Sequence, residues 1–374
     1  MLNIQKYFLE NNNHPLDLQE KIDYLKNTLN LNIKIQDNKI LLNYRIDSPK
    51  DSPIVNECRG LILDKNTFEV ICYPFNRFYN YGEGYAAKID WESAEIFEKL
   101  DGTAIFLWWD KEFNKWQVST RNMIYADGLV NENPLLSTKQ RTFAQLFWEI
   151  FKEKFQYTDK YNKDFTYCFE LCSLENKVFK EYKERDIVLL TTRNNKTLTE
   201  FEQCDSDIIA RNRMLTRPKR YKLSTLTLET VIKLIKDLDF KPYDEGFVVC
   251  DKYNNRIKVK NPDYFIYSAL KNNGNVEKNI VKLIVNNERD EFLSYFPEYT
   301  KTYDKLREKY FMLIKSAEIL YIEVQDKASQ KDFALSILFH PLSSLLFSIR
   351  AKKYSCFDDA VKDNLQLIEK VLLQ

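Results

Sequence analysis

The chain has 374 residues, 44% hydrophobic and 14% aromatic, and this length usually exceeds what one compact core holds. Its 56 basic and 55 acidic side chains give a net charge of +1, which excludes a globally basic polyanion-binding protein and leaves room only for a local basic patch. With only two histidines, most histidine-based triads and metal sites are excluded, so an enzyme of this composition would work with Lys, Arg, Asp and Glu.

The sequence shows no sign of export or membrane insertion. No run approaches the roughly 18 consecutive apolar residues of a membrane span, and the N-terminus lacks a basic region followed by an apolar core. The seven cysteines include no C-x-x-C pair, which favours a reducing compartment over a disulfide scaffold. We therefore expect a cytoplasmic protein without a membrane anchor.

Short β-type runs separated by turns dominate the first two thirds of the chain. Their β-branched and aromatic residues predict antiparallel sheets. Helical patterns interrupt these runs at 141–154 and 226–238. The expected strands are 60–64, 68–73, 104–109, 116–120, 165–171, 186–192, 246–250 and 256–260.

The pattern changes after Pro262, where apolar residues recur at steps of three and four and predict one long helix. Further helices are expected at 277–294, 332–349 and 357–373, with Pro341 dividing the second. The predicted class is α+β, with an antiparallel-sheet domain at 1–262 and an all-helical domain at 263–374. The stripe of the long helix consists of Tyr303, Leu306, Tyr310, Leu313, Ala317, Leu320 and Val324.

The segment "KLDGT" at 99–103 stands directly before an apolar strand. An Asp-Gly pair favours the positive-φ positions of a tight hairpin, and a lysine beside such a turn is usually solvated. The other interpretation makes Lys99 a nucleophile, which requires neighbours that favour its neutral form. The motif alone leaves both open.

The run "RIKVK" at 256–260 places Lys258 and Lys260 on the same face of a strand. Two such lysines repel each other unless an anion lies between them, and a phosphate suits this need. The alternative is an edge strand that its lysines protect from pairing. Glu245, just before an apolar strand, is either a surface turn residue or an inward carboxylate that binds a metal.

Taken together, these segments resemble the covalent nucleotidyltransferase superfamily of DNA ligases, RNA ligases and mRNA capping enzymes. The matching motifs are "KLDGT" at Lys99, "CFELCS" around Glu170, "EGFVV" at Glu245 and "KVK" at 258–260, and their order is that of the superfamily.

Two upstream segments narrow the resemblance. "NECRGLILD" at 56–64, "YPFNRFYNYGE" at 73–83 and the helical C-terminal region are similar to the T-even phage tRNA-repair RNA ligase family, the type 1 ATP-dependent RNA ligases. The resemblance implies an antiparallel-sheet nucleotidyltransferase domain of the ATP-grasp-like ligase kind at 1–262. It also implies a helical domain for RNA-substrate specificity at 263–374.

The chemistry that the resemblance implies has three steps. Lys99 attacks the α-phosphorus of ATP and keeps AMP as a lysyl adduct. The AMP passes to the 5′-phosphate end of an RNA, and a 3′-hydroxyl end then displaces it and seals the strand. Lys258 and Lys260 would hold the α-phosphate oxygens, while Arg59 and Arg77 would orient the β- and γ-phosphates.

The remaining roles also follow from the resemblance. Glu245 is the expected ligand of Mg²⁺, with Mn²⁺ as a substitute, because a hard cation prefers carboxylate oxygen. Glu170 is expected at the ribose hydroxyls of the nucleotide, and a role at the metal stays open for it. The backbone of Glu98 is expected at the adenine edge.

Three further residues are assigned less directly. Arg121 is expected to contact the nucleotide or the strand, and either Phe179 or Tyr182 to stack on adenine, with ordinary core packing as the alternative for both aromatics. Arg77 stands where this family often has lysine. The change keeps the positive charge, but a guanidinium contacts a phosphate through two donors arranged as a fork.

The implied partner is RNA with 5′-phosphate and 3′-hydroxyl ends, such as a cleaved tRNA anticodon loop. No P-loop motif is present, so we expect a separate kinase and phosphatase to prepare these ends. A monomer is expected, in the host cytoplasm if the chain is viral. Two alternatives remain: an ATP-dependent DNA nick-sealing ligase of the same superfamily, and a non-catalytic RNA-binding module.

Overall fold

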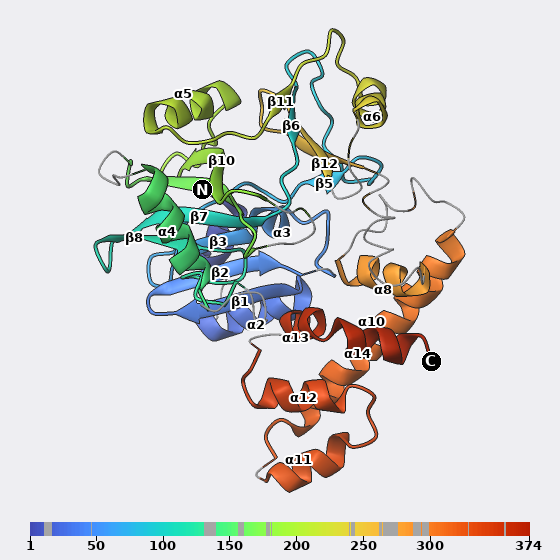
Figure 1. Ribbon diagram of the computed structural model, residues 1–374. Coiled ribbons are helices and arrows are strands. Elements are labelled where there is room, and N and C mark those ends of the chain that lie inside the picture. The colour runs from blue at the N-terminus through green and yellow to red at the C-terminus, as the bar shows by residue number, and fades with distance from the viewer. Residues whose placement is uncertain are drawn as a thin grey trace. The chain divides into compact units, whose positions relative to one another are not determined.

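The chain is divided into two compact units, Met1–Asn261 and Pro262–Gln374 (Figure 1). No helix among the described residues is both long and apolar enough to span a membrane. The computed structural model describes residues 1–10, 17–45, 47–130, 140–155, 161–176, 180, 182–238, 240, 244–261, 264, 276–286, 293, 299–327, 329–354 and 357–374.

The first unit contains three sheets, here called the first, second and third sheet. The first has the order β1 (Leu31–Gln36), β2 (Lys39–Tyr44), β3 (Arg59–Asp64), β4 (Val70–Cys72). The second has the order β10 (Asp186–Asn194), β9 (Phe165–Cys172), β7 (Thr103–Asp110), β8 (Lys115–Ser119). The third has the order β11 (Arg220–Tyr221), β6 (Glu95–Glu98), β12 (Gly246–Cys250), β13 (Arg256–Lys260), β5 (Tyr79–Asn80).

Helices α1 (Asn3–Leu9), α2 (Leu18–Thr28) and α3 (Pro53–Glu57) pack their apolar residues against the first sheet. The start of α2 is fixed by a capping box. Asp17 accepts a hydrogen bond from the Glu20 backbone N–H at 2.8 Å, and the Glu20 carboxylate accepts one from the Asp17 N–H at 2.9 Å. This covered sheet presents Tyr44 and Arg59 at its strand ends.

The second and third sheets are covered by helices of their own. Helix α4 (Phe143–Phe155) packs against the second sheet, to whose core α5 (Gln203–Arg213) also contributes. Helix α6 (Leu228–Asp237) packs against the third. Each side chain that these faces bury completely stabilises the fold by roughly 1.5–3 kcal/mol. A further buried cluster joins the first and second sheets and includes Leu41, Ile62, Phe106, Trp108 and Cys168.

All eight strands expected from the sequence are present within a few residues of their predicted bounds, as are the two helices. The predicted fold class, α+β with antiparallel sheets before a helical region, is confirmed. One pairing departs from it, because β5 runs parallel to β13. The sequence pattern does not predict strands β1, β2, β5, β6 and β11.

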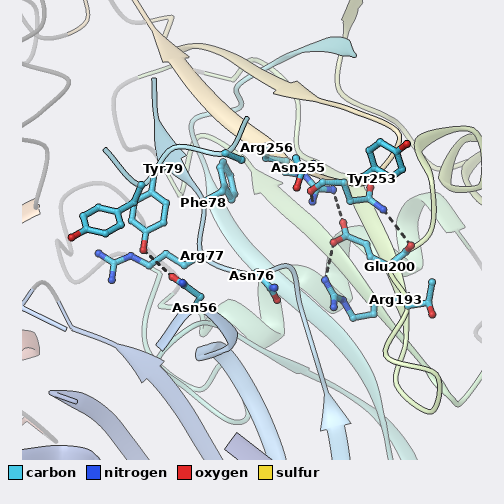
Figure 2. Close-up of a pocket in the computed structure, with 14 residues that line it drawn as sticks. Asn56, Asn76, Arg77, Phe78, Tyr79, Arg193, Glu200, Tyr253, Asn255 and Arg256 are labelled. Atoms are coloured by element: carbon cyan, nitrogen blue, oxygen red, sulfur yellow. Dashed lines mark hydrogen bonds and ion pairs between the residues drawn. The ribbon is translucent and has the colours of Figure 1, made fainter. Parts of the chain in front are cut away.

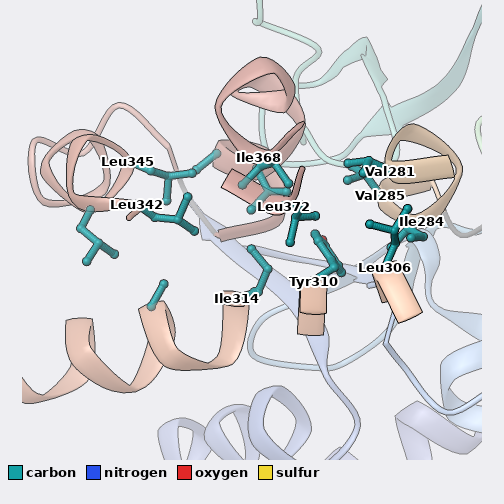
Figure 3. Packing of buried hydrophobic residues seen from close by; sticks show 14 of the residues in the cluster. Val281, Ile284, Val285, Leu306, Tyr310, Ile314, Leu342, Leu345, Ile368 and Leu372 are labelled. Carbon is teal, nitrogen blue, oxygen red and sulfur yellow. The ribbon is translucent and has the colours of Figure 1, made fainter. Parts of the chain in front are cut away.

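The second unit is helical throughout its described residues. The predicted stripe of α10 is buried at Tyr303, Leu306, Tyr310, Ala317 and Val324, whereas Ile314 replaces Leu313 at the centre of the packed face. Figure 3 shows Leu306, Tyr310 and Ile314 of this helix beside apolar residues of the neighbouring helices, such as Ile284 and Leu372. Pro341 lies between α11 and α12, as expected. The helices are α8 (Val276–Asn286), α10 (Thr300–Val324), α11 (Gln330–Ile337), α12 (Ser343–Arg350), α13 (Phe357–Asp363) and α14 (Leu365–Leu372).

Candidate active site

Three strand ends of the third sheet bring Lys99, Glu245 and Lys260 together. Gly246 is paired with Lys260 and Phe247 with Glu98, so the end of β6, the start of β12 and the end of β13 lie at one edge. Glu245 Oε2 lies 2.5 Å from Lys99 Nζ, and its Oε1 lies 3.7 Å from Lys260 Nζ. The three side chains are 21%, 10% and 4% exposed, respectively, so the carboxylate bridges two largely desolvated lysines.

Two motif glycines are explained by close backbone approach. A Cβ on Gly246, which has φ +126°, would lie 2.3 Å from the Val259 carbonyl oxygen, so this conformation and spacing require glycine. A Cβ on Gly102 would lie 2.4 Å from the Leu171 carbonyl oxygen. The structure excludes the tight-hairpin interpretation of Asp-Gly, because β6 and β7 belong to different sheets and Gly102 has no positive φ.

Glu170, on β9, faces the same edge. Its Oε1 accepts a hydrogen bond from the Gly102 backbone N–H at 3.1 Å. Burial raises the pKa of Glu170 to about 7, with Glu245 adding to the rise and Lys99 opposing it. Glu170 is therefore close enough to Lys99 and Glu245 for their charges to affect its pKa.

The opposite shift holds for Glu245 itself. Burial alone would raise the pKa of Glu245, but the charges of Lys99 and Lys260 outweigh it and hold this pKa below its ordinary value. Burial lowers the pKa of Lys258 to about 8, and the positive charges of Lys260 and Lys99 contribute to this decrease. Lys258 and Lys260 are thus both close to the nucleophile candidate. Because β13 lies between β12 and β5, the edge-strand interpretation of these lysines is excluded.

Lys180 and Tyr182 brace the loop that carries Lys99. Lys180 Nζ lies 2.7 Å from Glu98 Oε1 and 2.8 Å from Asp244 Oδ1, which ties the residue before Lys99 to the residue before Glu245. The Tyr182 hydroxyl accepts a hydrogen bond from the Asp101 N–H at 2.9 Å, and burial raises the pKa of this tyrosine. We call Lys99, Lys180, Lys260, Glu98, Asp244 and Glu245 the nucleophile cluster.

A second group of charges surrounds Tyr44 at the end of β2. Arg121 Nη1 donates a hydrogen bond to the Tyr44 hydroxyl at 3.3 Å, and the Arg77 guanidinium lies 4.2 Å from the ring centroid. Burial tends to raise the pKa of Tyr44, yet Arg121, Arg59, Lys258 and Arg77 together lower it to about 7. We call these five residues the Tyr44 cation cluster.

The positive charge of this cluster is not compensated within the part of the chain that the structure describes. None of its four cations there forms an ion pair with a carboxylate, and the buried Nη1 of Arg59 has no hydrogen-bond partner. The Arg59 guanidinium lies 4.3 Å from the Phe75 ring centroid, and burial lowers its pKa. An arrangement of this kind fits an anionic ligand with several oxygens.

The structure therefore gathers most of the residues predicted from the sequence into two adjoining clusters. Glu98 makes its side-chain contact with Lys180, and its backbone N–H donates to the Lys219 carbonyl at 2.8 Å. Phe179 lies outside the described residues. Tyr44, Lys180 and Asp244 were missed, because no motif marks them and their roles depend on pairing between distant segments.

A metal site rests on one carboxylate. No group of three or more His, Cys, Asp or Glu side chains suited to a metal ion occurs among the described residues. Mg²⁺ commonly uses one or two carboxylates together with water and substrate phosphates, and Glu245 fits this mode.

A family model described as RNA ligase matches residues 57–267, which is more than half of the chain. The chain belongs to the T4-type RNA ligase family. The prediction of an ATP-dependent RNA ligase is thereby confirmed at the level of the family, and its substrate class is RNA.

The chain is also similar to individual proteins. The RNA ligase of Rhodothermus phage RM378 is 26% identical over 380 residues and 84% of each chain is covered. A putative bifunctional polynucleotide kinase/RNA ligase of Autographa californica nuclear polyhedrosis virus is 29% identical over 276 residues, which cover 69% of this chain and 37% of that protein. A solved archaeal ATP-dependent RNA ligase is 12% identical with a TM-score of 0.46, covering 90% of this chain and 88% of that one.

Proposed function

We propose that the protein joins RNA ends with the energy of ATP, through an AMP group carried on Lys99. The observation that supports this most is the 2.5 Å contact between Lys99 Nζ and Glu245, with Lys260 on the other carboxylate oxygen. A lysine held among cations beside an uncompensated basic cluster suits attack on a phosphate.

In the first step, Lys99 Nζ attacks the α-phosphorus of ATP. An N–P bond forms, the bond from the α-phosphorus to the bridging oxygen breaks, and pyrophosphate leaves. Lys258 and Lys260 hold the nonbridging oxygens on which charge accumulates, and Arg59 and Arg77 orient the two outer phosphates. These roles match the position of the Tyr44 cation cluster beside the nucleophile cluster.

Before it attacks, Lys99 has to lose a proton from Nζ. The contact with Glu245 stabilises the ammonium form, so it must loosen when the nucleotide binds. Once Lys99 has moved away, the Glu245 carboxylate would be available to hold Mg²⁺ or Mn²⁺, which would supply positive charge against the phosphate oxygens.

The other nucleotide contacts follow from the same geometry. The charge of Lys99 acts on the Glu170 carboxylate, which therefore lies close to the nucleophile. This carboxylate is proposed to accept hydrogen bonds from the ribose hydroxyls of the nucleotide. The Tyr182 ring lies beside the Lys99 loop. Of the two aromatic residues proposed to stack on adenine, it is the one that the structure describes.

The two later steps use RNA. A 5′-phosphate oxygen of the RNA attacks the phosphorus of the lysyl adduct, the N–P bond breaks, and AMP is attached to the RNA through a pyrophosphate link. A 3′-hydroxyl oxygen then attacks the 5′-phosphorus, and AMP leaves. We propose repair of cleaved RNA, such as a tRNA anticodon loop, with Pro262–Gln374 contributing substrate specificity and a kinase and phosphatase supplying ends of this type.

The test uses ATP labelled at the α-phosphate. The purified protein with Mg²⁺ should form an adduct that is stable to alkali and labile to acid. Lys99→Ala should abolish the adduct without changing the thermal melting temperature, and Lys99→Arg should do the same because a guanidinium does not deprotonate. Absence of the adduct in the wild-type protein would refute the proposal. Sealing of a nicked DNA duplex in preference to single-stranded or stem-loop RNA would contradict the RNA specificity.

A further inference from the structure

A second pocket lies in the first unit, apart from the nucleophile cluster (Figure 2). Its volume is about 520 Å³, within the range of cavities that hold a small ligand or one nucleotide. None of Lys99, Glu245 and Lys260 lines it, whereas Arg77 and Phe78 do. Phe78 lies 5.0 Å from Lys258 Nζ, measured to its ring centroid, so the pocket adjoins the Tyr44 cation cluster.

The wall of the pocket is built around a buried ion network. Figure 2 shows the Glu200 carboxylate between Arg193 and Arg256, with an Arg193 Nη2 to Glu200 Oε2 distance of 2.8 Å. The lining contains three arginines, Arg77, Arg193 and Arg256, and one glutamate, Glu200. Its net charge is therefore positive. Because Arg193 and Arg256 are held by Glu200, they form a fixed wall rather than a clamp for several phosphates.

The rim carries aromatic rings and amide groups. Tyr253 is 67% exposed and Tyr85 is 50% exposed, which is enough ring surface for contact with a ligand. A lysine ammonium lies over each ring, Lys252 Nζ 4.9 Å from the Tyr253 centroid and Lys50 Nζ 6.0 Å from that of Tyr85, and these cations add to the positive charge at the rim. The Oδ1 of Asn255 and the Nδ2 of Asn76 form no hydrogen bond with the described residues, which leaves one acceptor and one donor at the lining. Stacking faces with a few amide groups and a weak positive charge are the features that bind single-stranded nucleic acid bases.

Strand β13 connects the pocket to the reaction centre. Arg256, Lys258 and Lys260 alternate along it and therefore lie on the same face. Arg256 lines the pocket, and Lys260 contacts Glu245 of the nucleophile cluster. At roughly 3.3 Å per residue, the backbone distance between the two ends of this row is about 13 Å. A strand whose end reacts at Lys260 can therefore reach the pocket with a neighbouring nucleotide.

We propose that this pocket binds one nucleotide of the single-stranded RNA next to the end that is joined. Tyr253 and Tyr85 stack on the base, Asn255 and Asn76 contact its edge, and the cationic row of β13 guides the backbone. The inference rests on the proposed RNA ligation. A triphosphate tail is a poorer occupant, because two of the three arginines are already paired with Glu200.

The experiment compares Tyr253→Ala and Tyr85→Ala with Tyr24→Ala, a tyrosine of similar exposure (49%) on α2 that does not line the pocket. Binding of a short fluorescent 5′-phosphorylated single-stranded RNA is measured by anisotropy, and adduct formation from ATP is measured without RNA. Loss of one stacking ring should raise the RNA Kd roughly tenfold, while the adduct forms at the wild-type rate and Tyr24→Ala behaves as wild type. Each thermal melting temperature confirms folding.

A photocrosslink gives an independent readout. A 5′-phosphorylated RNA with 4-thiouridine near its reactive end should attach to the peptide that contains Tyr253. An unchanged RNA Kd in both variants, or crosslinks only outside the pocket, would overturn the inference. Loss of adduct formation in both variants would instead assign the pocket to ATP and overturn it as well. Because RNA binding is measured without ligation, a wild-type protein that forms no adduct would refute the proposed function separately.

Discussion

The nucleophile cluster and the Tyr44 cation cluster lie in the same unit and differ in how their charge is balanced. In the first, Lys99, Lys180 and Lys260 each contact a carboxylate. In the second, four cations surround one phenol and several aromatic rings. In the first cluster, an ion pair must therefore break before a lysine can contact a ligand. In the second cluster, the cations can contact an anion without breaking an ion pair.

The largest expected effect comes from breaking the balance of the nucleophile cluster. Glu245→Gln leaves Lys99 and Lys260 without their shared counter-ion and removes the proposed metal ligand. We expect lysyl-AMP formation to fall by roughly 100-fold or more, and the free energy of unfolding to decrease by about 3 kcal/mol. Labelled-adduct kinetics and chemical denaturation measure the two effects. Glu92→Gln, at an exposed glutamate, serves as the control, and an adduct rate near the wild-type value would contradict the expectation.

The next effect concerns the unbalanced cluster. Arg59→Ala should raise the Kd for ATP roughly 10- to 100-fold, because hydrogen bonds to charged groups are lost. Calorimetry in a Lys99→Ala background measures binding without reaction. Arg141→Ala provides the comparison, since Arg141 already pairs with Glu149 at 3.0 Å and Glu175 at 3.1 Å. Equal effects of the two substitutions would show that the charge of Arg59 is not available to the nucleotide.

A smaller effect at neutral pH follows from Tyr44. Above about pH 7 its hydroxyl loses a proton, and the resulting phenolate competes with ATP for the surrounding cations. Binding of ATP then requires uptake of a proton, so the affinity should fall by up to about tenfold per pH unit. Lys258, whose pKa is about 8, adds to this loss above its own pKa by giving up its positive charge.

Tyr44→Phe removes the first of these two titrations and isolates the contribution of the phenol. The decrease in ATP affinity with rising pH should then be shallower than in the wild-type protein, because only Lys258 still titrates. Isothermal titration across the range from roughly pH 6 to pH 9 compares the two proteins in the Lys99→Ala background. Identical pH profiles would show that Tyr44 does not titrate against the nucleotide.

The smallest effect is expected at Lys180, which positions the two strands rather than touching the substrate. Lys180→Met should lower the rate constant for adduct formation about three- to tenfold and leave the KM for ATP nearly unchanged. Lys252→Met, at an exposed lysine paired with Asp90, is the matched control. A large rise in the ATP KM would place Lys180 among the nucleotide-binding residues instead.

The sequence predicts the local part of this comparison well. A period of two places Lys258 and Lys260 on one face, and the strand at 256–260 is observed with the predicted bounds. It does not predict which strands become neighbours. The contact between Lys99 and Glu245 joins residues that are 146 positions apart, and it depends on the register of β6 against β12.

The Tyr44 cation cluster could not be predicted from the sequence, for the same reason. Tyr44 belongs to a strand that was not predicted, and its neighbours Arg59, Arg77 and Lys258 come from three other segments. The hairpin interpretation of Asp-Gly could not be excluded from the sequence, because local turn preference says nothing about the sheet to which each flanking strand belongs. Glycine at 102 is required by the nearby Leu171 carbonyl, a contact between segments far apart in the chain.

The register of strand β13 decides which of its side chains face the core and which face the proposed binding sites. Its alternate positions point to opposite faces: Ile257 and Val259 fill the hydrophobic core, while Arg256, Lys258 and Lys260 lie on the face of the proposed binding sites. A shift by one position, as an inserted residue in the turn at 251–255 would impose, exchanges the two sets. It places three cations in the hydrophobic core and turns two apolar side chains toward the polar face. Insertions in this turn are therefore expected to be far more harmful than substitutions in it.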